Sequence, residues 1–431
     1  MYRNDINALK KWKLSENRKP LVLLGARQVG KTWLVKEFGK TEYRQMLYIN
    51  FELENHLQDV FLKNLDPERL LLEFEFHYNM RITPNDTLIV FDEIQAAARG
   101  ITSLKYFQEN APEYHVIAAG SLLGVQIRPG ESFPVGKVDF LKLNPMSFYE
   151  FLLAMGETGL ARILDEKRWD FLPTFTHKFT EFLRYYFYIG GMPEVVLAFA
   201  EKRDWQAARR LQKKILLAYE NDFAKYAPKE IFPRIKMVWD SIPIQLGKEN
   251  KKFLYGTIKE GARAKDFELA IQWLVDSGLL HKVHDVSKPA LPLSAYKELS
   301  AFKLYHNDVG LLGAMAGLAA KTVVLGDHLF TEFKGALSEQ YVYQELRLHS
   351  GLAICYYTFE RSKYEIDFLV QNEEDEIIPV EVKSGTNLHA YSFNVFCEKF
   401  KPQTAIRTSL ADYREEERMI NVPLYMVGSY W

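Results

Sequence analysis

The sequence predicts an α/β protein built from several domains. Over about the first third of the chain, short apolar segments alternate with helical stretches, which is typical of a parallel sheet with helices on both faces. The pattern then becomes mainly helical, and strand-like segments return after residue 278. A length of 431 residues leaves room for about three domains if each takes roughly 150 residues.

Charge and composition narrow the class of protein. Lysine and arginine together number 55, and aspartate and glutamate 56, so no overall positive field favours nucleic acid and any such surface must be local. The first residues, Met1 to Ile6, do not form a signal peptide, and no apolar run approaches the roughly 20 residues of a membrane span. We therefore expect a cytoplasmic protein with no membrane segment.

The cysteines and histidines offer no clear metal-binding spacing. Cys355 and Cys397 lie in apolar or aromatic surroundings without a CxxC pattern, so we expect buried, reduced thiols. His281 and His284, with Asp285, lack a further clustered ligand. The sequence therefore disfavours a zinc site at these residues.

Four apolar segments in the first part of the chain predict the strands of a doubly wound parallel sheet. They are Leu21–Leu24, Met46–Phe51, Leu88–Phe91 and Val116–Ala119. Helical stretches, such as the one from Leu57 to Tyr78, separate them.

A glycine-containing loop follows the first of these strands and opens a helical pattern. Its residues are Gly25, Ala26, Arg27, Gln28, Val29, Gly30, Lys31 and Thr32. The glycines let the backbone curl, so that successive N–H groups and the following helix N-terminus can bind phosphate oxygens. Lys31 is expected to reach the β and γ phosphates and Thr32 to hold Mg²⁺. The loop predicts a P-loop nucleotide site.

Two carboxylates directly follow the buried strand Leu88–Phe91, where parallel sheets bind ligands at their carboxyl edge. We assign Asp92 to the Mg²⁺ shell and Glu93 to orienting an attacking water. The competing interpretation is a helix cap, because acidic residues often begin helices. The tandem pair suits water activation, and so the sequence disfavours a kinase.

A third polar position, Ser121, follows the strand-like run 115–119 and is a candidate sensor of the γ phosphate. A serine that caps the next turn is an almost equal alternative. Arg27, Arg128 and Lys137 could neutralise phosphate charge, although nothing in the sequence selects one of them.

After Asn144 and Pro145 the pattern is helical to about residue 225, which predicts a helical lid. Residues 235–306 then suggest three helices followed by two strands, the order of a winged helix. Six basic residues precede or begin its third helix, where such a domain meets DNA phosphates. They are Lys248, Lys251, Lys252, Lys259, Arg263 and Lys265. Winged helices also serve as connectors, so DNA stays one of two interpretations.

The last part of the chain predicts two strands, Tyr364–Val370 and Ile377–Lys383, joined by an acidic turn. Alternation places Glu381 and Lys383 on one face of the second strand. If Asp367 lies alongside, two carboxylates could hold Mg²⁺ or Mn²⁺ while Lys383 steadies a water or the developing charge. Glu339, on the amphipathic helix before them, could add a further acidic group. This is the spacing of a PD-(D/E)xK nuclease core, although a Glu-x-Lys pair alone is a common salt-bridge pattern.

A series of motifs runs through nearly the whole chain. It comprises Gly25–Thr32, Phe91–Gln95, Ala119–Ser121, Phe133–Lys137, Pro145–Phe148, Gly190–Glu194, Lys303–Tyr305, Asp308–Leu312, Glu365–Asp367 and Pro379–Gly385. The series resembles that of the predicted AAA+ superfamily ATPases of bacteria and archaea that carry a C-terminal domain of unknown function with a nuclease-like core. The resemblance implies ATP as the nucleotide. Lys137 stands where we expect arginine in many relatives, so no arginine finger is assigned there.

Pattern and resemblance together predict four domains: a P-loop AAA-type ATPase core at 1–144, a helical lid at 145–228, a winged helix at 229–320 and a restriction-endonuclease-like α/β domain at 321–431. The main hypothesis is a Mg²⁺-dependent ATPase whose nucleotide state controls a nuclease-like domain that binds DNA, with a possible second divalent metal. The alternative is a nucleotide-switched interaction protein in which the nuclease-like fold is only a scaffold. Either form could be an oligomer.

Overall fold

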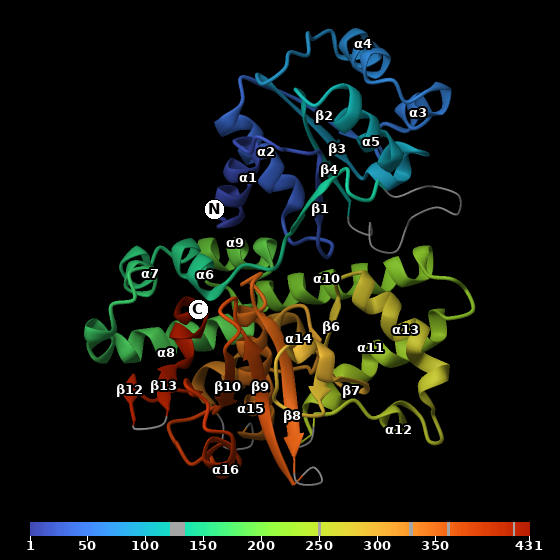
Figure 1. The fold of residues 1–431 in the computed structure, drawn as a ribbon. Coiled ribbons are helices and arrows are strands. Elements are labelled where there is room, and N and C mark those ends of the chain that lie inside the picture. Colours follow the sequence, from blue (N-terminus) through green and yellow to red (C-terminus); the bar gives the residue numbers. More distant parts are fainter. Residues whose placement is uncertain (121–133, 249–250, 327–330, 360–362, 417–418) are drawn as a thin grey trace. The chain divides into compact units, whose positions relative to one another are not determined.

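The structure is a computed structural model that describes residues 1–120, 134–248, 251–326, 331–359, 363–416 and 419–431. The chain divides into two compact units, which are described separately (Figure 1). The N-terminal unit contains residues 3–144 and 276–278. The C-terminal unit contains residues 1–2, 145–275 and 279–431.

A five-stranded sheet forms the centre of the N-terminal unit, in the order β2-β3-β4-β1-β5. Its strands are β1 (Leu21–Leu24), β2 (Gln45–Asn50), β3 (Thr87–Asp92), β4 (His115–Ala119) and β5 (Asp139–Lys142). Every neighbouring pair is parallel, which confirms the predicted parallel sheet. The sequence pattern does not predict β5, an edge strand whose residues are all half-buried or exposed.

Helices surround this sheet in the alternating order expected of the fold. They are α1 (Asp5–Lys13), α2 (Lys31–Glu42), α3 (Val60–Lys63), α4 (Pro67–Tyr78) and α5 (Gly100–Asn110), with the short 3-10 helices η1 (Asn55–Leu57) and η2 (Ile94–Ala96). The stretch from Leu57 to Tyr78 is broken into three pieces. Proline fits the first turn of a helix, and Asp66 caps α4 at Pro67 by accepting a hydrogen bond from the Glu68 N–H at 3.2 Å.

The core of the N-terminal unit is aromatic around β3, all of whose residues are buried. Phe91 packs against Phe51, with ring centroids 5.8 Å apart, and against Phe61 and Phe107 at 5.9 Å. Burial on both faces is what four consecutive apolar residues predict for a central parallel strand. Asp92 therefore projects from a strand that packing holds firmly.

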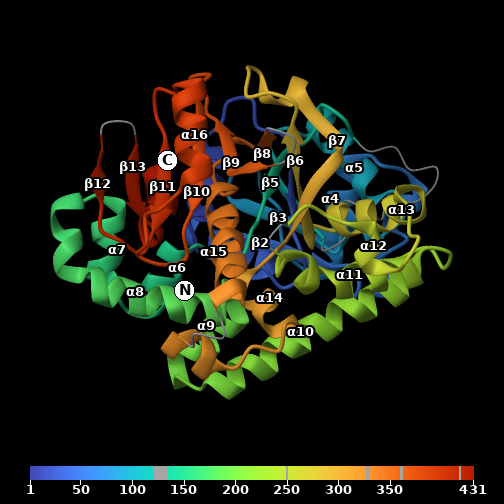
Figure 2. The ribbon, with the colours of Figure 1, turned by 90° about the horizontal axis from the view of Figure 1, so that it is seen from below.

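Among its described residues, the C-terminal unit contains one mixed sheet of eight strands, in the order β12-β13-β11-β10-β9-β8-β6-β7 (Figure 2). The strands are β6 (Leu280–Val286), β7 (Lys297–His306), β8 (Ala353–Phe359), β9 (Tyr364–Gln371), β10 (Ile377–Val382), β11 (Ile406–Ser409), β12 (Arg414–Glu415) and β13 (Ile420–Pro423). The β6–β7 hairpin is antiparallel, and β6 joins β8 in parallel at Asp285 and Tyr356. The segment that suggests a winged helix thus shares a sheet with the last part of the chain.

The helices of the C-terminal unit lie between residues 148 and 430. They are α6 (Phe148–Ala154), α7 (Thr158–Asp165), α8 (Leu172–Ile189), α9 (Pro193–Lys202), α10 (Trp205–Tyr226), α11 (Phe232–Leu246), α12 (Tyr255–Ile258), α13 (Ala264–Asp276), α14 (Val309–Met315), α15 (Thr331–Leu346), α16 (Tyr391–Phe400) and α17 (Val427–Tyr430). The order α11-α12-α13-β6-β7 is the order of elements that the sequence suggests for residues 235–306. Among the helices described, none combines the length and apolar character needed to span a membrane.

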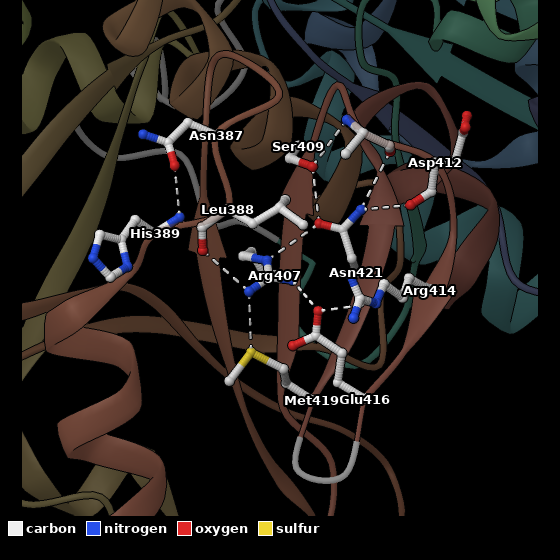
Figure 3. A network of polar contacts seen from close by, with 11 residues as sticks. Asn387, Leu388, His389, Arg407, Ser409, Asp412, Arg414, Glu416, Met419 and Asn421 are labelled. Carbon is white, nitrogen blue, oxygen red and sulfur yellow. Dashed lines mark hydrogen bonds and ion pairs between the residues drawn. The ribbon is translucent and has the colours of Figure 1, made fainter.

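A buried arginine holds the strands at one end of the mixed sheet together (Figure 3). Arg407 of β11 donates to Glu416 Oε1 at 2.9 Å, to the Leu388 carbonyl at 3.1 Å and to Asn421 Oδ1 at 3.3 Å. Asn421 of β13 in turn donates to the Asp412 carbonyl at 2.9 Å. A buried guanidinium needs hydrogen-bond partners. This network therefore fixes β11 against β13 and against the segments that contain Leu388 and Glu416.

Candidate functional site

The loop between β1 and α2 has the backbone curvature of a phosphate-binding loop. Gly25 and Gly30 have φ angles of 142° and 95°, and Gln28, although not a glycine, has a φ of 66°. A Cβ on Gly25 would lie 2.4 Å from the carbonyl oxygen of Leu143, so no other residue fits. The loop leads directly into α2, whose N-terminal N–H groups are available in principle to an anion.

The other predicted residues of this loop differ in how deeply their side chains are buried. Ala26 and Val29 are buried, whereas Arg27 and Gln28 are half-buried. The buried Arg3 donates to the Val29 carbonyl at 3.0 Å and so ties the loop to the segment before α1.

Lys31 begins α2 and is buried. Its Nζ donates to the carbonyl oxygens of Gly25 at 2.7 Å and Ala26 at 2.9 Å. Burial lowers its pKa to about 8, although Glu93 and Asp92 act in the opposite direction. The ammonium group therefore lies within the curve of the loop, where an incoming phosphate would favour its charged form.

Thr32 and Asp92 meet at the carboxyl end of β3. Thr32 Oγ1 donates to Asp92 Oδ2 at 2.9 Å, and the hydroxyl of Tyr48 donates to the same oxygen at 2.5 Å. Burial and the bond to Asp92 raise the pKa of Tyr48 above its ordinary value. A hydroxyl and a carboxylate in contact are two of the oxygen ligands that Mg²⁺ takes at P-loop sites.

Glu93 follows with a left-handed backbone, φ 50° and ψ 43°. Its Oε2 accepts a hydrogen bond from Gln95 Nε2 at 2.5 Å, and its N–H donates to Asp92 Oδ1 at 3.1 Å. A left-handed conformation is uncommon for glutamate and turns the chain sharply after the strand. The chain thus leaves the sheet at Glu93, and Gln95 holds the Glu93 side chain.

Sequence reasoning missed Tyr48 and Gln95 as members of this site. Gln95 stands in the quoted motif Phe91–Gln95 without a role, whereas Tyr48 becomes significant only through the parallel pairing of β2 with β3. Ser121 and Arg128 lie outside the described residues. Lys137 pairs with Glu109 at 3.0 Å.

A second cluster of charged side chains is buried in the C-terminal unit around Glu339 of α15. Glu339 Oε1 accepts hydrogen bonds from Lys303 Nζ at 2.9 Å and the Tyr305 hydroxyl at 2.8 Å. Lys251 Nζ pairs with Oε2 of the same group. Burial by itself would raise the pKa of Glu339, but Lys251 and Lys303 outweigh it and lower the pKa.

Asp367 of β9 lies in the same cluster. Carboxylate oxygens of Glu339, Glu365 and Asp367 lie within 4.8 Å of one another, and Lys303 Nζ also pairs with Glu365 Oε1 at 2.6 Å. Asp367 Oδ2 accepts a hydrogen bond from the Val382 N–H at 2.8 Å, which ties it to β10. Burial, together with Glu339 and Glu381, raises the pKa of Asp367.

Glu381 of β10 pairs with Lys383 at 2.7 Å, although β10 ends at Val382 and Lys383 lies just beyond the strand that the sequence predicts to include it. Burial raises the pKa of Glu381, while Lys383 lowers it. The structure thus brings Glu339 and Asp367 together and adds Lys251, Lys303 and Glu365, which sequence reasoning did not include in the site.

Carboxylate oxygens that could bind a metal in this cluster are already paired with lysine ammonium groups. Lys251 and Lys303 together contact both oxygens of Glu339, and Lys303 also contacts Glu365. A divalent ion bound to Glu339 would have to replace a lysine that the carboxylate now holds. The residues as arranged therefore do not fit a divalent metal at Glu339 beside both lysines.

The sequence pattern places Lys251 among the basic residues that could contact DNA phosphates. In the structure its ammonium group instead pairs with the buried Glu339. Lys259, Arg263 and Lys265 are exposed at and before the start of α13.

His281 contacts Arg347, and Asp285 accepts hydrogen bonds from the N–H and hydroxyl of Thr358. Cys355 and Cys397 are both buried, as expected.

Comparison with known protein families agrees with the P-loop geometry. Residues 17–152 match the AAA domain, residues 180–322 a domain of unknown function (DUF8612), and residues 334–427 another (DUF4143). No curated protein matches the chain.

Solved structures that are similar to the chain at low identity include the following two. A Walker-type ATPase of Pyrococcus abyssi is 14% identical, with a TM-score of 0.46, over 73% of this chain and 95% of that one. The ORC1 protein of Aeropyrum pernix, in complex with DNA, is 13% identical, with a TM-score of 0.26, over 72% of this chain and 90% of that one. The chain carries an AAA-type P-loop ATPase domain and, near its end, a DUF4143 domain.

Proposed function

We propose that the protein is a Mg²⁺-dependent ATPase whose nucleotide state controls its C-terminal domain. The contact of Thr32 Oγ1 with Asp92 Oδ2 at 2.9 Å carries the first half of this proposal. It joins the residue after the P-loop lysine to the acid at the end of the central strand, the two positions from which P-loop NTPases hold Mg²⁺.

The residues around this contact can each supply one step of hydrolysis. The loop N–H groups and Lys31 would bind the β and γ phosphates, and Thr32 and Asp92 would hold the Mg²⁺ that neutralises them. Glu93, held by Gln95 at 2.5 Å, would orient the water that attacks the γ phosphorus. Bound Mg²⁺ would supply charge stabilisation for the phosphoryl group as it leaves ADP.

Phosphate release from ATP by the purified chain tests this assignment. Lys31→Ala should abolish nucleotide binding, whereas Glu93→Gln should bind ATP and fail to turn it over. Lys40→Ala, which removes an exposed lysine in the last turn of α2, serves as the control and should keep both activities. Turnover that survives in both of the first two variants would overturn the proposal.

For the C-terminal unit we carry two candidates. In the first, the Glu339, Asp367, Glu381 and Lys383 group cleaves or binds nucleic acid under nucleotide control, and cleavage would require a divalent ion to displace Lys251 or Lys303 from Glu339. The exposed Lys259, Arg263 and Lys265 support contact with DNA phosphates. In the second, the unit is a nuclease-like scaffold for a nucleotide-switched interaction, and the contacts of Lys251 and Lys303 with Glu339 favour it.

Cleavage of labelled single- and double-stranded DNA separates the two candidates. The assay uses Mg²⁺ or Mn²⁺, with and without ATP, and compares the wild type with Asp367→Ala. Cleavage that the variant loses would establish the nuclease and reveal any gating by ATP. No cleavage, together with no heat of Mn²⁺ binding that depends on Asp367, would favour the scaffold and leave the ATPase assignment intact.

A further inference from the structure

A pair of histidines on the N-terminal unit comes together with a glutamate outside the nucleotide site. His56 belongs to η1 and His77 to the last turn of α4, and their Nε2 atoms lie 3.3 Å apart. Glu54 immediately precedes η1, and one ligand atom from each of the three residues lies within 4.8 Å of the others. We propose that Glu54, His56 and His77 form a site for a divalent transition metal, with Zn²⁺ as the expected ion.

The spacing of the two nitrogens supports a shared ion. Zinc binds imidazole nitrogen at about 2.0–2.1 Å in tetrahedral geometry, which separates two bound nitrogens by about 3.3–3.4 Å. The observed Nε2–Nε2 distance of 3.3 Å falls at that value. Both histidines are exposed, so an ion can reach them, and three protein ligands leave a fourth position for water.

Glu54 is held in place by groups that are not metal ligands. Its Oε2 accepts a hydrogen bond from the Tyr78 hydroxyl at 2.5 Å, and its Oε1 accepts one from the Asn50 N–H at 3.2 Å. Outer contacts of this kind orient carboxylate ligands and raise metal affinity. Tyr78 also packs edge-on against the His77 ring, with centroids 4.7 Å apart.

The donor set selects a class of ion. Two imidazoles and one carboxylate suit Zn²⁺, Co²⁺, Ni²⁺ or Cu²⁺, whereas Mg²⁺ prefers oxygen ligands alone. The site is therefore chemically separate from the Thr32–Asp92 pair, and it does not depend on the proposed ATPase activity. A bound ion would cross-link the segment after β2 to the end of α4.

Calorimetric titration of the full, untagged chain with Zn²⁺ tests the site, after treatment with chelator and in excess Mg²⁺ to fill sites that prefer oxygen ligands. We expect one Zn²⁺ per chain to bind here, and His56→Ala or His77→Ala to weaken that event more than about tenfold. His177→Ala, which removes an exposed histidine of α8, is the matched control and should bind as the wild type does.

Two further readouts separate a metal site from a hydrogen-bonded histidine pair. Co²⁺ bound to the wild type should show the visible absorption of tetrahedral imidazole coordination, and His56→Ala should lose it. Zn²⁺ should raise the melting temperature of the wild type but not of His77→Ala, while the metal-free proteins melt alike. Zn²⁺ binding equal in the wild type and in both histidine variants would overturn the proposal.

Discussion

Asp308 accepts a hydrogen bond from the backbone N–H of Gly191 at 2.6 Å, across 117 positions of the chain. The same carboxylate caps α14 by accepting from the Leu311 N–H at 2.9 Å. Two sequence motifs, Gly190–Glu194 and Asp308–Leu312, therefore form one structural joint between the end of α8 and the start of α14. Glycine is required there because a Cβ on Gly191 would lie 2.2 Å from the Met146 carbonyl oxygen.

Gly191→Ala should destabilise the C-terminal unit by about 1–3 kcal/mol, because the added methyl group meets backbone that cannot move aside. Gly159→Ala in α7 is the control, since nothing lies within 4 Å of its Cβ position, and it should be neutral or slightly stabilising. Urea unfolding of both variants measures the difference. Equal midpoints for the two would contradict the close contact.

Tyr48→Phe removes only the hydroxyl that donates to Asp92 Oδ2 at 2.5 Å. If Asp92 holds Mg²⁺, loss of this outer contact should weaken the apparent Mg²⁺ affinity of ATP turnover about 10–100-fold. A titration of turnover against Mg²⁺ gives the value. Tyr413→Phe loses a hydroxyl contact to Glu415 at the surface and should leave the titration unchanged.

Gln95→Ala should lower kcat for ATP and leave the affinity for nucleotide nearly unchanged. Gln95 touches the side chain of Glu93 at 2.5 Å, so its loss frees the group that would orient water. We expect a fall of about tenfold or more, since general-base positioning contributes on the order of 10²–10⁴-fold. Nucleotide binding measured by fluorescence and turnover by phosphate release separate the two effects. A raised KM with normal kcat would contradict this role.

Four strands of the N-terminal unit and its P-loop were predictable from the sequence because their signals are local, whereas the edge strand β5 was not. An apolar run, a glycine loop and a helical pattern all lie between Leu21 and Phe38, and the acids follow their strand directly. Tyr48 could not be found in this way, because its contact with Asp92 depends on the pairing of β2 with β3.

The buried charged cluster of the C-terminal unit also depends on strand pairing that a local sequence pattern does not reveal. Glu339, Asp367, Glu381 and Lys383 carry a spacing that the sequence displays, whereas Lys303 reaches Glu339 only because β6 and β7 join the sheet of β8 and β9. Strand register is set by contacts far apart in the chain, so a local pattern does not reveal it.

Lys303→Met should destabilise the C-terminal unit by about 3–5 kcal/mol, because it leaves two carboxylates with less compensation in a buried place. The Lys303 side chain is 0% exposed and contacts Glu339 and Glu365 at 2.9 and 2.6 Å. The double variant Lys303→Met, Glu339→Gln should recover part of the loss. Lys178→Met breaks an exposed pair with Glu157 and should cost less than about 1 kcal/mol. Similar losses for the two lysine variants would contradict the buried role.

Glu345→Gln should remove a pH dependence of stability that the buried Glu345 of α15 creates. Burial raises the pKa of Glu345 from 4.5 to about 8, and its Oε1 accepts a hydrogen bond from the Phe148 N–H at 2.9 Å. Between these two pKa values the folded chain holds a proton that the unfolded chain releases, so stability is fully present below pH 4.5 and is lost as pH rises through about 8. The glutamine variant should therefore unfold at the same urea concentration as the wild type near pH 4.5. By pH 8 it should be more stable, by at most about a few kcal/mol. Glu201→Gln on the exposed face of α9 should follow the wild type at every pH, and equal slopes for all three proteins would show that Glu345 does not bind the proton.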